Sequence, residues 1–470
     1  MASFGAAVAL FGAIILAQGI GGPAKAQIAV RNQGYVPFSE PPINYRSHPL
    51  TDPVALLQKD IDGGKVSLVY DKDRGYLESV LKALKIPASS QTLVFSRTSF
   101  QFTNISPEHP RALYYNDDVY VGAVHRGKTV EIISFDPMQG AIFYLLNDQQ
   151  VDNPVFERAE LDCTQCHIAA ATRGVPGVLV RSVYPSHNGN IVPRAPQYLT
   201  DQKSPLNERW GGWYVTGALA PATMANAAAG VRPDGGPTPI DAPPPPLGLI
   251  GKPFDASSYI VPTSDQVALL VLGHQAQMHN LITLVNYQTR IALHTLAGNG
   301  AAPVAPALAT LPADAQQKIT RPAEQLLRYL LFSEETPLGG LDERKAIAAS
   351  AFAREFAAQG PRDGRKRSLR DFDLRDRIFR YPCSYLIYSA AFDAIPEPAK
   401  DYIYHRLLQV LTGEDQSPDF GHLTPRDRQA ILAILLETKA GLPDEWRRHA
   451  GAKRPRVAGR PENAPAKTTT

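Results

Sequence analysis

A proline-rich stretch between Gly230 and Pro253 constrains the fold more than any other feature of the sequence. It contains consecutive prolines at 243–246, which can continue neither a helix nor an inner strand, because proline lacks the backbone N–H and fixes φ. The segment therefore predicts a stiff spacer. At 470 residues the chain is also longer than one hydrophobic core usually supports. We expect an N-terminal domain at 27–230, a linker at 231–262 and a second domain at 263–445.

The N-terminal domain carries the signals of a small antiparallel sheet. Residues 53–84 have helical periodicity in two pieces that are broken near Gly63 and Gly64. After them come three β-like segments whose separations, at 126–127 and at 137–140, are typical of hairpin turns. The sequence therefore predicts a β-meander with strands at Val119–His125, Thr129–Phe135 and Ala141–Leu146.

The second domain has helical periodicity throughout. A long helix is expected to begin at Thr263, with Gln266 completing a capping box, and to end near Gly298. Its apolar residues step by three or four positions, which predicts one buried face. Residues 446–470 are basic, small and polar, which predicts a disordered tail. The fold class is therefore α+β, and further helices are expected at 322–333, 341–358, 384–393, 397–412 and 425–439.

The first 26 residues have the pattern of an export signal. An apolar run from Phe4 to Ile20 is followed by the small-residue site Ala24-Lys25-Ala26, which predicts cleavage after Ala26. No Lys or Arg precedes the run, so a retained membrane anchor is the alternative. No later stretch is long and apolar enough to cross a bilayer. We expect a soluble periplasmic or otherwise exported protein, or an anchored one if the segment is retained.

Charge and cysteine content narrow the function classes. The net charge of +3 is too small to indicate a nucleic-acid partner, and the basic residues of 362–380 are interleaved with aspartates, which predicts a self-paired surface. Three cysteines cannot all pair within one exported chain. Cys383 is solitary and lies before an aromatic run, so we expect a buried, inert thiol.

Residues Cys163-Thr-Gln-Cys166-His167 form the motif that carries chemistry. Its spacing lets two thiols react with the two vinyl groups at one edge of a porphyrin while the adjacent imidazole reaches the iron. A zinc site would need two further ligands, and Cys383 is alone; a redox dithiol would favour a βαβ context and needs no histidine. The motif resembles the haem-attachment signature of the c-type cytochromes. That resemblance implies one covalent haem c in the N-terminal domain, with thioethers at Cys163 and Cys166 and His167 as the proximal iron ligand.

The second axial ligand decides between electron transfer and ligand chemistry, because an open iron position admits small molecules. Met278 is the preferred candidate from the sequence, since it shares a helix face with His274 one turn earlier. His274 and Met224 are the alternatives, and His187 is ranked after them. Each has an ordinary structural explanation too, since a methionine or histidine on an apolar stripe usually belongs to the core.

These features together predict an exported monohaem c-type cytochrome that transfers electrons and has a protein redox partner. The first alternative is a haem enzyme with an open distal position, such as a peroxidase-like oxidoreductase. The large helical domain motivates it, because a simple carrier of one haem needs only about a hundred residues. The second alternative is a haem-based sensor or ligand-binding module. The electron donor, the acceptor and any substrate are not indicated by the sequence.

Overall fold

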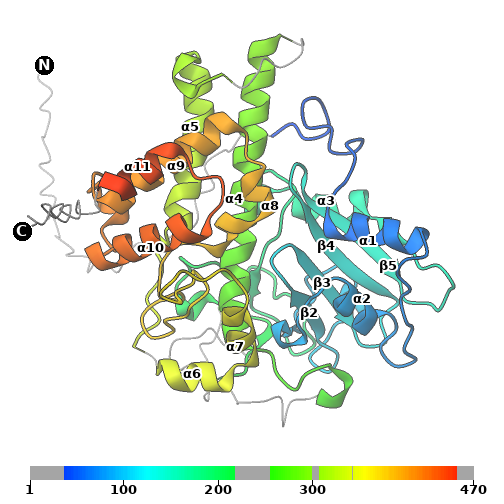
Figure 1. Cartoon of the computed structure of the whole chain (residues 1–470). Coiled ribbons are helices and arrows are strands. Elements are labelled where there is room, and N and C mark those ends of the chain that lie inside the picture. Colours follow the sequence, from blue (N-terminus) through cyan, green and yellow to red (C-terminus); the bar gives the residue numbers. More distant parts are fainter. Residues whose placement is uncertain (1–35, 218–253, 299–305, 341, 453–470) are drawn as a thin grey trace, which may run out of the picture.

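The protein was analysed as a computed structural model, which describes residues 36–217, 254–298, 306–340 and 342–452. Its class is α+β: strands fill the first part of the chain and helices the second (Figure 1). Seven strands form one antiparallel sheet in the order β6-β5-β4-β3-β2-β1-β9. A separate pair is formed by β7 (Arg181–Val183) and β8 (Gln197–Leu199).

The predicted meander is confirmed. Strands β3 (Val119–Val124), β4 (Thr129–Asp136) and β5 (Gly140–Asn147) pair in sequence through short turns. Gly140 opens β5 at a φ of +69°, a left-handed conformation that glycine adopts without strain. The remaining strands of the sheet are β1 (Thr92–Val94), β2 (Arg111–Tyr115), β6 (Phe156–Arg158) and β9 (Trp213–Tyr214).

The two faces of the sheet are covered by different elements. One face packs against α1 (Pro53–Asp62) and α2 (Leu77–Ala83) in a core that includes Tyr114, Val121 and Ile132. The break predicted near Gly63 is present, and the second helical piece is confined to α2. Residues at the alternate strand positions, among them Tyr115, Tyr120 and Phe143, face the opposite core, as the two-residue period of a strand requires.

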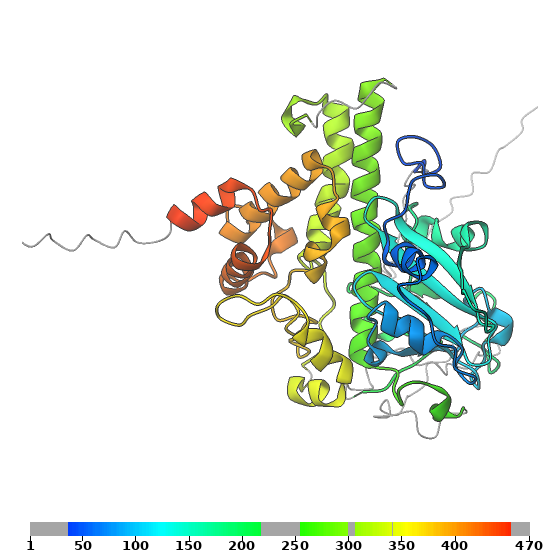
Figure 2. The same cartoon turned by 45° about the vertical axis from the view of Figure 1, so that its right-hand side comes forward.

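Helix α4 (Gln266–Ala297) occupies that opposite face. It is 32 residues long and stands between the sheet and the other long helices (Figures 1 and 2). The expected capping box at Thr263 is wrong, because Asp265 is the cap: its carboxylate accepts hydrogen bonds from the backbone N–H groups of Val267 and Ala268. The helix ends at Gly298, as predicted. It is buried on all sides from Gln266 to Tyr287, not on one face, because sheet and helices enclose it.

The remaining helices follow the predicted periodicity with shifted ends. Helix α5 begins earlier than expected and contains Pro322. The helix expected at 341–358 is broken at Ser350, whose hydroxyl caps the second of its two pieces. The helix expected at 384–393 is a 3₁₀ turn followed by one short helix. The bounds are α5 Ala313–Leu330, α6 Glu343–Ala349, α7 Ala351–Ala358, α8 Ala390–Asp393, α9 Glu397–Thr412 and α10 Pro425–Thr438.

Two predicted boundaries differ from the structure. Residues placed at the start of the disordered tail belong to α11 (Asp444–Ala452), because Trp446 is fully buried and its indole N–H donates to the carbonyl of Tyr404 at 3.2 Å. The end of the expected linker is packed as well: Tyr259 is buried and its hydroxyl donates to Pro110 O. The proline run itself, the segment 1–26 and residues 453–470 lie outside the described residues.

One apolar core joins the sheet to the helices. It includes Tyr120 and Phe143 of the sheet, Met278 of α4 and Leu326 of α5, without interruption. The division into two domains remains a prediction, but α4 belongs to the packing of both parts. None of the described helices is long and apolar enough to span a membrane.

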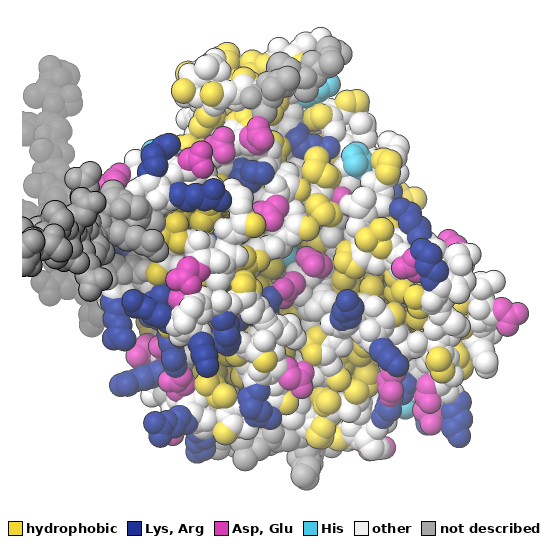
Figure 3. Space-filling view, in the orientation of Figure 1, with side chains coloured by type: hydrophobic (Ala, Val, Ile, Leu, Met, Phe, Trp, Pro, Cys, Tyr) yellow, Lys and Arg dark blue, Asp and Glu magenta, His cyan; other side chains and the backbone are white. Residues whose placement is uncertain are grey.

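Acidic and basic side chains are interspersed on the face shown in Figure 3. Within 362–380 the expected self-pairing is present in the ion pairs of Arg362 with Asp371 and of Arg367 with Asp363. Other arginines of the segment pair with Asp117, Asp427 and Glu343. The predicted pairing within the segment is therefore confirmed for Arg362 and Arg367, while Asp117, Asp427 and Glu343 compensate the other arginines from outside it.

The capping carboxyl of α4 gives the fold a testable pH dependence. Burial raises the pKa of Asp265 to about 6 from its ordinary 3.8, and the side chain is only 4% exposed. The folded state therefore favours the protonated acid, so its stabilising contribution is present below about pH 4 and is lost as the pH rises through about 6. Asp265→Asn keeps the cap without the charge. Urea unfolding from pH 3.5 to 7.5 should show wild type losing about 3 kcal/mol relative to this variant. A constant difference across that range would contradict the assignment.

Candidate haem-attachment site

The motif lies on helix α3 (Glu160–His167), which follows directly from edge strand β6 and packs over β5. Cys163 is partly buried and packs against the large core, while Cys166 is exposed. The helix places Cys163, Cys166 and His167 on the wall of one pocket. The three residues singled out from the sequence are therefore brought together around one space.

His167 is held in one orientation. Its ring Nδ1 lies 2.8 Å from the carbonyl oxygen of Gly177, and a carbonyl can only accept, so Nδ1 carries the proton. The Gly177 N–H in turn donates to His167 O at 3.0 Å. Burial lowers the pKa of His167, so the imidazole is neutral at pH 7. These contacts leave the Nε2 lone pair available to a metal, which is the arrangement that metal-ligating histidines use.

The loop that carries Gly177 is fixed by helix α4. The Asn280 side-chain oxygen accepts from Val178 N at 3.0 Å, and its amide donates to Val178 O at 2.8 Å. Gly177 lies so close that a Cβ at this position would overlap the Asn280 side chain. The hydrogen bonds between Asn280 and Val178, and between Gly177 and His167, therefore connect α4 to the His167 ring and set the angle of the ring.

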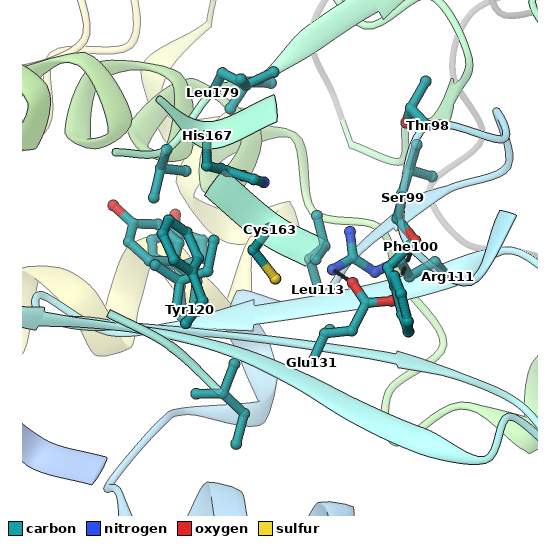
Figure 4. A pocket seen from close by; sticks show the side chains of 18 of the residues that line it. Thr98, Ser99, Phe100, Arg111, Leu113, Tyr120, Glu131, Cys163, His167 and Leu179 are labelled. Atoms are coloured by element: carbon teal, nitrogen blue, oxygen red, sulfur yellow. Dashed lines mark hydrogen bonds and ion pairs between the residues drawn. The ribbon is translucent and has the colours of Figure 1, made fainter. Parts of the chain in front are cut away.

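The pocket has a volume of about 260 Å³ and is mostly apolar at its centre. Figure 4 shows the His167 ring and the Cys163 sulfur entering it from α3, above the strands that form its floor. Trp213 is part of the pocket wall, and both it and Trp210 belong to the large core. Apolar lining residues include Val94, Leu113, Ile133, Phe143, Leu145, Val178, Leu179, Val180 and Leu272.

The structure does not bring the predicted distal ligands to this pocket. Met278 is fully buried in the core around α4 and is not part of the pocket wall. His274 uses both ring nitrogens elsewhere, with Gln202 Oε1 at 2.6 Å and Ser384 Oγ at 2.8 Å, and burial lowers its pKa to about 3. His187 is exposed, and Met224 lies outside the described residues. Within the described lining, His167 is the single histidine and methionine is absent.

A buried polar network links the pocket wall to the helices. Gln275 of α4 donates to Asn116 O and to the Tyr120 hydroxyl, and its carbonyl oxygen accepts from the Tyr385 hydroxyl. The Tyr120 hydroxyl, which accepts from Gln275, can then donate to His279 Nδ1 at 3.1 Å. The sequence analysis missed this network, because its members lie up to 269 positions apart, between Asn116 and Tyr385.

The sequence analysis also missed the ion pair of Arg111 and Glu131, which lines the pocket. A signal was present: both are charged residues at inward positions of strands whose neighbours are apolar. Cys383, by contrast, is fully buried as expected, and burial raises the pKa of its thiol well above the ordinary range. It is therefore unreactive in the folded state.

Comparison with known protein families, curated proteins and solved structures found no match to this chain. Among the described side chains, no three His, Cys, Asp or Glu residues lie close enough together to hold a metal ion. One neutral imidazole that can ligate iron, and two thiols that can form thioethers, lie on the wall of one pocket and fit a covalently attached haem.

Proposed function

We propose that this chain is an exported c-type haem protein that transfers electrons. The observation that carries the proposal is the joint position of Cys163, Cys166 and His167 on one apolar pocket, with the imidazole neutral and oriented by Gly177. The haem would be held by thioethers from the two cysteines and by Nε2 of His167, and when bound it supplies a one-electron couple. Export rests on the pattern of residues 1–26 and on the attachment of c-type haem after translocation.

The chain's own residues perform three tasks in this proposal. Trp213, Phe143 and the leucines of the wall exclude water from the pocket, which fixes the dielectric around the bound group. Gly177 and Asn280 hold the imidazole at a set angle. Cys166 is exposed, so the haem edge attached to it would lie near solvent, where a protein redox partner could approach.

One observation favours a second candidate function. The described wall offers neither methionine nor a second histidine, and the charged pair Arg111–Glu131 lies on its floor. That arrangement suits an iron with one open position, as in a haem enzyme of the peroxidase-like class or a ligand-binding sensor. The resting ferric spectrum separates the candidates: a low-spin spectrum supports the carrier, and a high-spin spectrum that shifts with peroxide or carbon monoxide supports the open site.

Two methionine variants, measured by the same spectra, test whether a methionine is the second axial ligand of the iron. Met278→Leu should leave the ferric and ferrous spectra unchanged, because Met278 packs in the core away from the pocket. If the wild type is low-spin with a thioether ligand, Met224→Leu should convert it to high-spin. A spectrum that changes with Met278→Leu and not with Met224→Leu would contradict the placement of the α4 methionine.

A further inference from the structure

Arg111 and Glu131 form an ion pair inside the haem pocket rather than at the protein surface. Arg111 belongs to β2 and Glu131 to β4, and their side chains are 16% and 13% exposed. Glu131 is itself anchored: Oε1 accepts from Gln101 Nε2 at 3.0 Å and from Ser99 Oγ at 3.3 Å, while Oε2 accepts from Arg111. The carboxylate is thus fixed by three donors and holds the guanidinium in place.

Gly122, on the intervening strand β3, makes room for this pair. A Cβ there would overlap the Arg111 guanidinium, so the group lies directly against the strand backbone. Within the described residues, Arg111 Nε is buried and has no hydrogen-bond partner. A guanidinium presents five N–H donors, and Glu131 engages only one side of it. Arg111 therefore retains donors for a further acceptor.

The pair lies across the pocket from His167. Figure 4 shows Arg111 and Glu131 rising from the strands while His167 enters from α3. His167 and the ion pair line the same pocket, so one bound group could contact both.

We propose that Arg111, positioned by Glu131 and Gly122, binds an anionic oxygen group in this pocket. The inference rests on the proposed haem site and adds the class of chemical group that Arg111 would bind there. Guanidinium groups bind carboxylates and small oxyanions strongly when both are partly desolvated. Two sources share that chemistry: a propionate of the haem that Cys163 and Cys166 would hold, and a free small oxyanion bound in the same pocket.

The test uses the full chain loaded with haem, with nitrite as the probe. Nitrite is titrated by absorption spectroscopy, and the midpoint potential is measured from pH 5 to 9, in wild type, Arg111→Gln and Arg111→Lys. The double variant Arg111→Gln/Glu131→Gln removes both charges, so that no lone buried carboxylate disturbs folding. Arg406→Gln is the matched control, because Arg406 is also a partly buried guanidinium paired with carboxylates, those of Glu324 and Asp415, but it is not part of the pocket wall.

A free oxyanion predicts that Arg111→Gln weakens nitrite binding by about 10- to 100-fold, with partial recovery in Arg111→Lys and no change in Arg406→Gln. A haem propionate predicts unchanged nitrite affinity but a shifted pH dependence of the midpoint potential in both Gln variants. If neither quantity moves although haem content is normal, the inference is overturned and the haem assignment stands. Absence of covalent haem in the wild type overturns the assignment itself, and this inference with it.

Discussion

Replacing Asn280 by leucine is expected to lower the free energy of unfolding by about 3 to 5 kcal/mol, because two buried backbone groups lose their partners. The Asn280 side chain serves both the N–H and the carbonyl of Val178, and it is fully buried on α4. Leucine has a similar volume and offers neither donor nor acceptor. The same change should loosen the Gly177 loop that orients His167, so the haem spectrum should become heterogeneous.

Thr283→Val is the control for this prediction. Thr283 also lies buried on α4, but its hydroxyl donates to His279 O within the same helix. Losing that bond should cost less than about 1 kcal/mol, since no group of another segment is left unpaired. Urea unfolding followed by circular dichroism measures both variants. Equal stability losses in the two would show that Asn280 does not tie the loop to the helix.

Replacing His167 by glycine is expected to have the largest effect on the spectrum. In the proposed haem protein, the thioethers should keep the haem on the chain, while the iron would lose the single imidazole of the described pocket wall. The cavity that the missing ring leaves should accept free imidazole from solution. Added imidazole should then restore the wild-type absorption spectrum and much of the wild-type midpoint potential, because the ligand atom is the same.

A matched comparison is provided by His274→Gln. His274 is buried and hydrogen-bonded to Gln202 and Ser384, far from the motif in sequence and outside the pocket wall. This variant should change stability without changing the iron spectrum, and imidazole should have no effect on it. If His274→Gln altered the spectrum as strongly as His167→Gly, the assignment of the proximal ligand would be wrong.

Local patterns predicted the elements around the site well. The strands at 119–124, 129–136 and 140–147 follow from β-branched and aromatic residues between turn residues, and these depend on neighbours in sequence. The ends of α9 and α10 were close for the same reason. Elements whose ends depend on tertiary contacts were missed. Helix α11 is an example, because it is stabilised by the burial of Trp446 against Tyr404, a residue distant in sequence.

The far wall of the pocket could not be predicted in the same way. Met278 and His274 share a helix face, as the periodicity indicated, but which element covers that face depends on how the sheet docks on α4. The sheet instead presents Arg111 and Glu131, from strands whose pairing had to be known before the two charges could be placed together. The motif itself was found from sequence because its chemistry depends on spacing within five residues.

The most direct test of the account is the pyridine haemochrome spectrum of denatured protein, expressed with a c-haem maturation system. Wild type is compared with the Cys163→Ala/Cys166→Ala double variant. The account predicts one haem per chain that stays with the denatured wild type and is absent from the double variant. A wild-type protein that carries no covalent haem would contradict the central claim, and a redox dithiol at Cys163 and Cys166 would then be the better interpretation.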